Sequence, residues 1–171
     1  RKSSKIAIKM LERLLEAGFD KDISIKLINS TLIANLEEDM YATLDVAILD
    51  LYKGNLEFIK NGACPTFIKR GKEIQILKSL ELPTGIVENM DLVVYDYDLQ
   101  PDDLIVMCTD GVIESNTEYI SKELWIKYLL EDMQTTDAQK IADIILSEAI
   151  DNNYGKQKDD MTVIVAKIGR F

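Results

Sequence analysis

The stretch DDLIVMCTDGV, residues 102–112, is the part of the sequence that decides the fold. Five consecutive apolar residues, Leu104 to Cys108, follow a turn-forming run and predict a buried strand rather than a helix. The strand leads into Asp110 and Gly111, and glycine allows a sharp turn and a close approach of the backbone to a ligand. We therefore expect Asp110 to lie at the edge of a sheet with a bare backbone beside it.

A second stretch, DDMTVIV at residues 159–165, has the opposite order, because Asp159 and Asp160 precede a β-branched strand. If this strand pairs antiparallel with residues 104–108, the end of one strand lies beside the start of the other. Asp110 and Asp159 then converge at one edge of the sheet. Two carboxylates that lie so close repel each other unless a cation lies between them. An oxygen-rich site of this kind suits magnesium or manganese.

The composition excludes several classes of chemistry. The chain has no histidine, which rules out histidine-based zinc sites, Ser-His-Asp triads, Cys-His pairs and phosphohistidine chemistry on this chain. Its 30 acidic and 20 basic residues give a formal net charge of −10, which argues against nucleic acid or an anionic membrane as the main partner. The length of 171 residues is within the usual size of a single domain.

Two cysteines, Cys64 and Cys108, stand in apolar surroundings and are expected to be small buried hydrophobic residues rather than a disulfide. Unpaired thiols favour a reduced, cytoplasmic setting. No apolar stretch approaches the roughly 20 residues that span a bilayer, and no signal peptide opens the chain. We expect no direct membrane contact by this domain, and a membrane anchor of the full-length protein would lie in a region before Arg1.

Hydrophobic periodicity predicts helices and strands along the whole chain. Apolar residues recur at helical spacing in four segments and at strand spacing in seven. The expected helices are 4–17, 20–36, 122–131 and 137–151, and the expected strands are 41–51, 56–60, 66–69, 73–78, 90–98, 104–108 and 161–168. Helices, a run of strands, helices and a final strand predict an α+β protein with mainly antiparallel sheets.

The two aspartate motifs, TDGV with Glu114 and DDMT at 159–162, resemble the last two metal motifs of the metal-dependent serine/threonine phosphatases of the PPM, or type 2C, family. Three middle segments follow in the order typical of its bacterial branch: TLDVAILDL at 43–51, KNGACPTFI at 60–68 and LPTGI at 82–86. Within that branch, the strand PTFIKR at 65–70 is most similar to the phosphatase domain of the stage II sporulation protein E family. The resemblance implies an α/β/β/α four-layer sandwich of two mainly antiparallel sheets flanked by helical pairs.

The resemblance also implies a site. It makes Asp110 and Asp159 the catalytic metal ligands of two divalent ions, Mn²⁺ or Mg²⁺, with Gly111 and Asp160 supporting them. Members of the family carry an Asp-Gly-Met-Gly motif upstream of the first long helix. We therefore expect residues 1–171 to be a single phosphatase domain, a fragment that lacks the N-terminal strands and this first motif, and weakly active or inactive by itself.

Alternatives remain open for several of these residues. Asp110 by itself reads as a turn residue, because Asp-Gly is a common turn dipeptide, and only its pairing with Asp159 favours a metal ligand. Asp160 fits two roles equally well: a residue that supports the metal ligands, or a solvated carboxylate in a loop. Residues 114–116 could line a substrate entrance, but we expect an ordinary polar loop there.

The resemblance implies a protein serine phosphatase that acts on a phosphorylated anti-sigma-factor antagonist and so activates a sporulation sigma factor. A homodimer is compatible with the sequence. The competing interpretation is a non-catalytic, phosphatase-like module that binds a regulatory partner. A haloacid-dehalogenase-type phosphatase is set aside, because its nucleophilic aspartate would stand at the position of Cys108.

Overall fold

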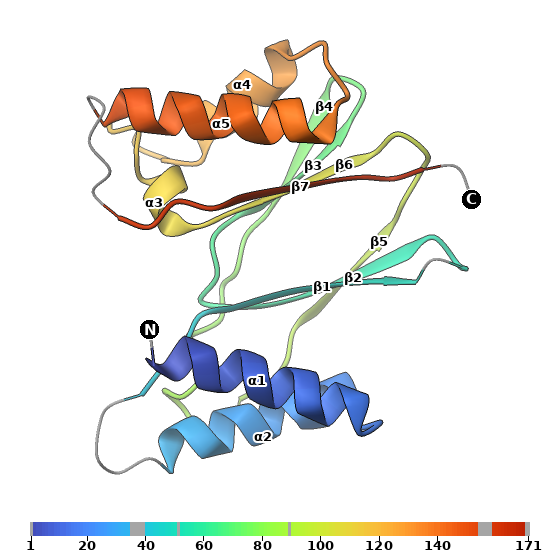
Figure 1. Ribbon diagram of the computed structural model, residues 1–171, viewed down its shortest axis with the longest axis vertical. Helices are drawn as coiled ribbons and strands as arrows, with labels where there is room; N and C mark the ends of the chain where they lie inside the picture. Colours follow the sequence, from blue (N-terminus) through green and yellow to red (C-terminus); the bar gives the residue numbers. More distant parts are fainter. Residues whose placement is uncertain (1, 35–39, 51, 89, 154–158, 170–171) are drawn as a thin grey trace. The chain divides into compact units, whose positions relative to one another are not determined.

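The computed structural model describes residues 2–34, 40–50, 52–88, 90–153 and 159–169. The chain forms two compact units, and each is assembled from segments that are far apart in the sequence. Unit 1 comprises Arg1–Leu49, Leu56–Ala63 and Ser79–Tyr97, and unit 2 comprises Asp50–Asn55, Cys64–Lys78 and Asp98–Phe171. Each unit has its own sheet and its own helices (Figure 1).

Unit 1 pairs two helices with a three-stranded sheet. The helices are α1 (Lys2–Glu16) and α2 (Lys21–Ile33), and the strands are β1 (Leu44–Asp50), β2 (Asn55–Asn61) and β5 (Val94–Asp98), in the order β1-β2-β5. Gly18, at a φ of 82°, ends the first helix, and the Asp20 side chain caps the second by accepting the Asp22 N–H. The apolar faces of both helices pack on the sheet, through Ala7, Ile25, Ile28, Leu32, Leu44 and Ile59.

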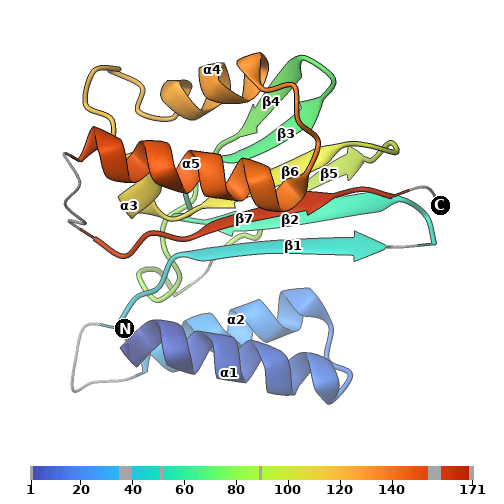
Figure 2. The same ribbon diagram turned by 45° about the horizontal axis from the view of Figure 1, so that its top comes forward.

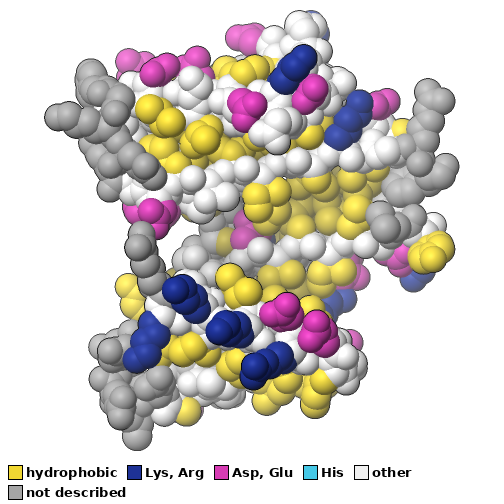
Figure 3. Space-filling view, viewed as in Figure 1, with side chains coloured by type: hydrophobic (Ala, Val, Ile, Leu, Met, Phe, Trp, Pro, Cys, Tyr) yellow, Lys and Arg dark blue, Asp and Glu magenta, His cyan; other side chains and the backbone are white. Residues whose placement is uncertain are grey.

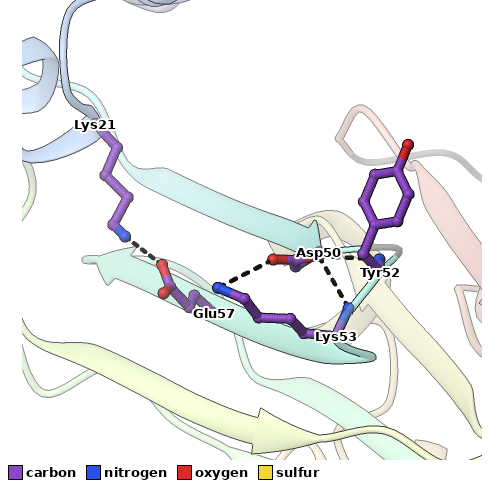
Figure 4. Close-up of polar contacts among 5 residues, drawn as sticks. All are labelled: Lys21, Asp50, Tyr52, Lys53 and Glu57. Atoms are coloured by element: carbon purple, nitrogen blue, oxygen red, sulfur yellow. Dashed lines mark hydrogen bonds and ion pairs between the residues drawn. The ribbon is translucent and has the colours of Figure 1, made fainter.

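Ion pairs fix the polar side chains of unit 1. Lys21 reaches from α2 to Glu57 on β2 (Figure 4), and this hydrogen bond raises the pKa of Lys21. Lys60 is fully buried, and its ammonium lies 2.7 Å from the Asp45 carboxylate on β1. A buried charge is tolerated only when it is paired, and Asp45 provides such a partner for Lys60.

The outer face of α1 is basic although the chain as a whole is acidic. Figure 3 shows Lys and Arg side chains gathered over this helix. The helix exposes three lysines and an arginine at helical spacing, namely Lys2, Lys5, Lys9 and Arg13. The formal net charge of −10 therefore does not describe every surface of the protein.

The hairpin turn between β1 and β2 is held by the side chain of Asp50. Asp50 accepts hydrogen bonds from the N–H groups of Tyr52 and Lys53, at 2.9 and 3.0 Å (Figure 4). These bonds hold the pKa of the Asp50 carboxyl below its usual range. An aspartate that accepts from the backbone two and three residues ahead is a common way to close a turn.

The rest of unit 2 is a four-stranded antiparallel sheet with helices on one face (Figure 2). Its strands are β3 (Thr66–Arg70), β4 (Glu73–Leu77), β6 (Leu104–Cys108) and β7 (Val163–Lys167), in the order β4-β3-β6-β7. Its helices are α3 (Asp110–Ile113), α4 (Leu124–Asp132) and α5 (Ala138–Asn152). In the register between β6 and β7, Leu104 lies opposite Lys167 and Cys108 lies opposite Val163.

The core of unit 2 lies between this sheet and the helices α4 and α5. Val106 on β6, Ile126 on α4 and Ile145 on α5 are completely buried and belong to one apolar cluster. Polar groups in this core find partners: the Trp125 indole donates to the Ile113 carbonyl at 3.1 Å, and Lys69 donates to the Leu130 carbonyl at 2.6 Å. Burial lowers the pKa of Lys69.

Much of the predicted architecture is confirmed. The α+β class with two antiparallel sheets is found, and the strand at 104–108 has the predicted bounds. The strand expected from Tyr41 begins only at Leu44, because Ala42 instead forms an isolated bridge with Thr84. The last residues of the helix expected at 20–36, and residue 51 of that strand, lie outside the described residues. The single domain over residues 1–171 stays a prediction.

The short helix α3 was not predicted, because its four residues are too few for a periodic pattern. In the described part of the chain, no helix is long and apolar enough to cross a membrane.

A pair of glycine substitutions tests how tightly unit 1 is packed. Gly85 has a φ of 98°, and a Cβ added there would lie 2.4 Å from the Met40 carbonyl oxygen. Gly71 has a φ of 61° with open space around it. We expect Gly71→Ala to cost about 1 kcal/mol, the strain of the left-handed conformation, and Gly85→Ala to cost clearly more because of the clash. Urea unfolding measures both; equal losses would contradict the close approach.

Candidate metal and active site

The site is built where β6 ends and β7 begins. Because the two strands pair antiparallel with Cys108 opposite Val163, the residues after β6 lie beside those before β7. Thr109 ties the two segments: its hydroxyl donates to the Asp160 carbonyl at 3.1 Å and accepts the Thr162 N–H at 2.9 Å. Its own N–H donates to the Thr162 carbonyl at 3.1 Å. Three hydrogen bonds from one residue therefore set the spacing of the two aspartate segments.

Gly111 lets these segments approach closely. A Cβ at this position would lie 2.6 Å from the Asp160 carbonyl oxygen and 3.3 Å from the Asp159 Cβ. The sequence predicted a close backbone approach at Gly111, with a ligand as the neighbour. In the structure the neighbour is the chain itself, so the glycine is needed to bring Asp159 beside Asp110.

The two carboxylates are oriented by their neighbouring backbone. Asp110 is the first residue of α3, and its Oδ1 accepts the Gly111 N–H at 2.9 Å. Asp159 Oδ1 accepts the Asp160 N–H at 2.7 Å. Within the described residues, the second oxygen of each carboxylate has no hydrogen-bond partner.

Asp110 and Asp159 line the same pocket, which has a volume of about 230 Å³. The other lining residues are Gly111, Glu114 and Asn153. Glu114 is paired with Lys122 at 3.1 Å, whereas no described residue forms an ion pair with Asp110 or Asp159. The convergence predicted from the sequence is therefore present, and the pocket holds two carboxylates whose repulsion a cation would relieve.

This donor set fits magnesium or manganese, which prefer carboxylate oxygens. The set is partial, however. Among the described residues no three Asp, Glu or Cys side chains converge closely enough to hold a metal ion by themselves. Asp110 and Asp159 as metal ligands therefore stay a prediction, and further ligands would be needed to complete each site.

The neighbouring polar residues differ from expectation. Residues 114–116 were expected to be an ordinary polar loop, but Glu114 lines the pocket. Ser115 is buried, and its hydroxyl has no hydrogen-bond partner in the part of the chain that the structure describes. Asp160 contributes its backbone carbonyl to the Thr109 contact, and the role of its carboxylate stays a prediction.

Asn153 was missed altogether. It lines the pocket from the end of α5, and the sequence offered only a polar run after a helix as a signal.

Cys64 and Cys108 are not joined in a disulfide, as predicted. Cys108 is buried in the apolar core of unit 2, whereas Cys64 is only partly buried and packs against that core. Burial, with a smaller effect of Cys64, raises the pKa of Cys108 to about 12. A thiol with so high a pKa is almost entirely protonated near neutral pH, so Cys108 is a poor nucleophile despite lying two residues from Asp110.

The Thr109 contacts can be tested with Thr109→Val, which keeps the side-chain shape and removes the hydroxyl. The Thr162 N–H loses its acceptor, so we expect a loss of about 1–2 kcal/mol in the free energy of unfolding and faster amide exchange at Thr162. Thr117→Val, at an exposed position, is the matched control. Unchanged exchange at Thr162 in Thr109→Val would show that the hydroxyl does not hold the two segments together.

The Cys108 thiol provides a second test. At pH 8 a thiol of pKa about 12 is ionised in roughly one molecule in ten thousand. Iodoacetamide should therefore label Cys108 in the folded protein at a negligible rate and label it readily in guanidinium chloride. Peptide mass spectrometry follows the two cysteines separately. Rapid labelling of Cys108 in the folded protein would mean that the thiol is not buried and that its pKa is not raised.

Comparison with known proteins extends this picture. The model of the family described as stage II sporulation protein E (SpoIIE) matches residues 3–169. Stage II sporulation protein E of Bacillus subtilis is 39% identical over 161 residues, which cover 94% of this chain and 20% of that protein. Phosphoserine phosphatase RsbU of B. subtilis is 25% identical over 160 residues, 92% of this chain and 48% of RsbU. This chain thus spans only part of the curated relatives it matches.

Two solved structures are also similar. The PP2C phosphatase domain of SpoIIE from B. subtilis, solved with a fragment of the regulatory domain, aligns with a TM-score of 0.87 at 39% identity. The alignment covers 95% of this chain and 49% of the other. The phosphatase domain of SpoIIE from B. subtilis presoaked with Mn aligns with a TM-score of 0.73 at 36% identity, covering 96% and 74% of the two chains.

Proposed function

Since this chain belongs to the stage II sporulation protein E family, we propose that it is a metal-dependent protein serine phosphatase domain of the PP2C type. The observation that carries the proposal is the convergence of Asp110 and Asp159 on one pocket, at the end of β6 and the start of β7. These two residues stand in the motifs by which the sequence resembles the type 2C phosphatases. The family membership supports the reaction class, and the pocket supports the choice of Asp110 and Asp159 as its residues.

In this proposal Asp110 binds one divalent ion and Asp159 binds the other, as Mn²⁺ or Mg²⁺. The Mn-presoaked SpoIIE phosphatase domain supports manganese as one of the metals. When bound, the ions supply the positive charge that offsets the phosphoryl oxygens and lower the pKa of water toward neutrality. The remaining ligands would come in part from the Asp-Gly-Met-Gly motif that the resemblance places before the first helix.

The residues of this chain prepare the pocket for that chemistry. Thr109 and Gly111 hold the two carboxylates at a fixed separation, so the ligands are oriented before a metal arrives. Lys122 pairs with Glu114 and offsets its negative charge at the pocket wall. The chain has no histidine, and Cys108 is held protonated, so direct attack by water fits these residues better than a histidine or cysteine phosphoenzyme.

The substrate in this proposal is a phosphoserine on an anti-sigma-factor antagonist protein, whose dephosphorylation would activate a sporulation sigma factor. The similarity to a stage II sporulation protein and to phosphoserine phosphatase RsbU supports this choice.

A second candidate function is a phosphatase-like module that binds a partner without catalysis. The observation that favours it is that, among the described residues, no three potential ligands converge on a metal position.

Activity measurements separate the two functions. Phosphate release from a phosphoserine protein is measured with Mn²⁺ or Mg²⁺, using a form of the protein extended before Arg1. We expect Asp110→Asn and Asp159→Asn each to lower the rate on the order of 100-fold or more, because each removes a charged ligand. Asp132→Asn, at an exposed position at the end of α4, is the control and should keep its activity.

An extended protein that is folded and inactive with both metals would favour the partner-binding module. Full activity of Asp110→Asn would overturn the assignment of the site.

A further inference from the structure

The pocket contains one side chain that the proposed reaction has not used. Asn153 is only 5% exposed and lies in the pocket wall with Asp110, Glu114 and Asp159. The three acidic side chains can only accept hydrogen bonds when ionised. Asn153 is the one lining side chain, among the described residues, that carries N–H groups. Of the described residues that line the pocket, Asn153 is thus the single side-chain donor beside three carboxylates.

The end of α5 holds this amide in place. The Asn153 N–H donates to the Ile150 carbonyl at 3.1 Å, and its Nδ2 lies 3.4 Å from the Ala149 carbonyl. A separation of 3.4 Å is beyond the usual range for N–H···O bonds, so this contact is weak and a better acceptor can compete for Nδ2. The neighbouring Asn152 accepts from Asn116 at 3.4 Å and links the loop after α3 to the same helix end.

The left-handed backbone conformation does not explain an asparagine at this position. Asparagine is favoured after helices where the backbone must adopt the left-handed conformation. Asn153 has a φ of −92°, which almost any residue can adopt. The backbone conformation thus does not require the amide, and among the described contacts Nδ2 has only the long one to the Ala149 carbonyl to offset the cost of its burial.

A phosphate monoester needs such a donor in this pocket. Its negative charge is repelled by Asp110, Asp159 and Glu114, and a metal ion offsets charge without fixing the position of every phosphoryl oxygen. A neutral amide can donate to one of these oxygens, and a hydrogen bond to a charged acceptor is among the stronger ones.

We propose that Asn153 is a substrate-binding residue whose Nδ2 donates a hydrogen bond to a phosphoryl oxygen of the phosphoserine in the pocket of Asp110 and Asp159. The inference rests on the proposed function and adds a specific contact to it. The same contact would bind the inorganic phosphate product.

The test compares two neighbouring asparagines in the protein that contains this chain. Asn153→Asp keeps the side-chain shape and replaces the donor with a negative charge, and Asn152→Asp makes the same change one residue away, outside the pocket lining. With p-nitrophenyl phosphate as substrate, we expect Asn153→Asp to raise KM and the inhibition constant of inorganic phosphate about tenfold or more. Asn152→Asp should leave both within about twofold.

Asn153→Ala removes the donor without adding charge. It should raise the same two constants while leaving unchanged the Mn²⁺ concentration that gives half-maximal activity. A shifted Mn²⁺ requirement with unchanged phosphate constants would mean that Asn153 binds metal instead, and no change in either would mean a purely structural role. Both outcomes overturn the proposal.

A binding measurement keeps the test independent of turnover. Calorimetric titration of inorganic phosphate in the presence of Mg²⁺ should show the same loss in Asn153→Asp, and thermal unfolding checks that the variants are folded. If Asp110→Asn abolishes activity while the Asn153 variants bind phosphate normally, only the Asn153 contact fails. If Asp110→Asn remains fully active, the proposed function fails first.

Discussion

The antiparallel pairing of β6 with β7 is the interaction on which the rest of this structure depends. It places Cys108 opposite Val163, so the residues that follow β6 lie beside the residues that precede β7. Thr109 extends the pairing beyond the strands by donating to the Asp160 carbonyl and accepting the Thr162 N–H. A slip of one residue in this register would turn every side chain of β7 to the opposite face and separate the two aspartates.

Close packing around the pairing determines which residues the site can tolerate. Gly111 has the Asp160 carbonyl oxygen 2.6 Å from the position of a Cβ, so any side chain there would push the two segments apart. Behind the site, the buried residues Val106 and Ile126 anchor β6 against α4. The site is therefore supported by a packed core, and Asp110 and Asp159 lie in short segments attached directly to strands of that core.

Electrostatics explains why such a site would bind a cation before it binds a phosphate ester. Asp110 and Asp159 have no described basic partner, whereas Glu114 is paired with Lys122. An acidic pocket repels a phosphate dianion until metal ions reverse the local charge. A neutral hydrogen-bond donor such as the Asn153 amide can then favour one orientation of the ester, because its hydrogen bond is directional and adds no charge to the pocket.

The sequence by itself determined the strand at 104–108, the α+β class, the burial of Cys108 and the convergence of Asp110 with Asp159. These features depend on local hydrophobic pattern and on the order of residues around two strands, both of which are readable from the chain. Only the tertiary structure decided that Glu114 and Asn153 line the same pocket and that Gly111 meets the chain rather than a ligand. Asn153 reaches the pocket because α5 packs across the sheet, and its proximity to Asp110 and Glu114, which are distant in sequence, leaves no local pattern.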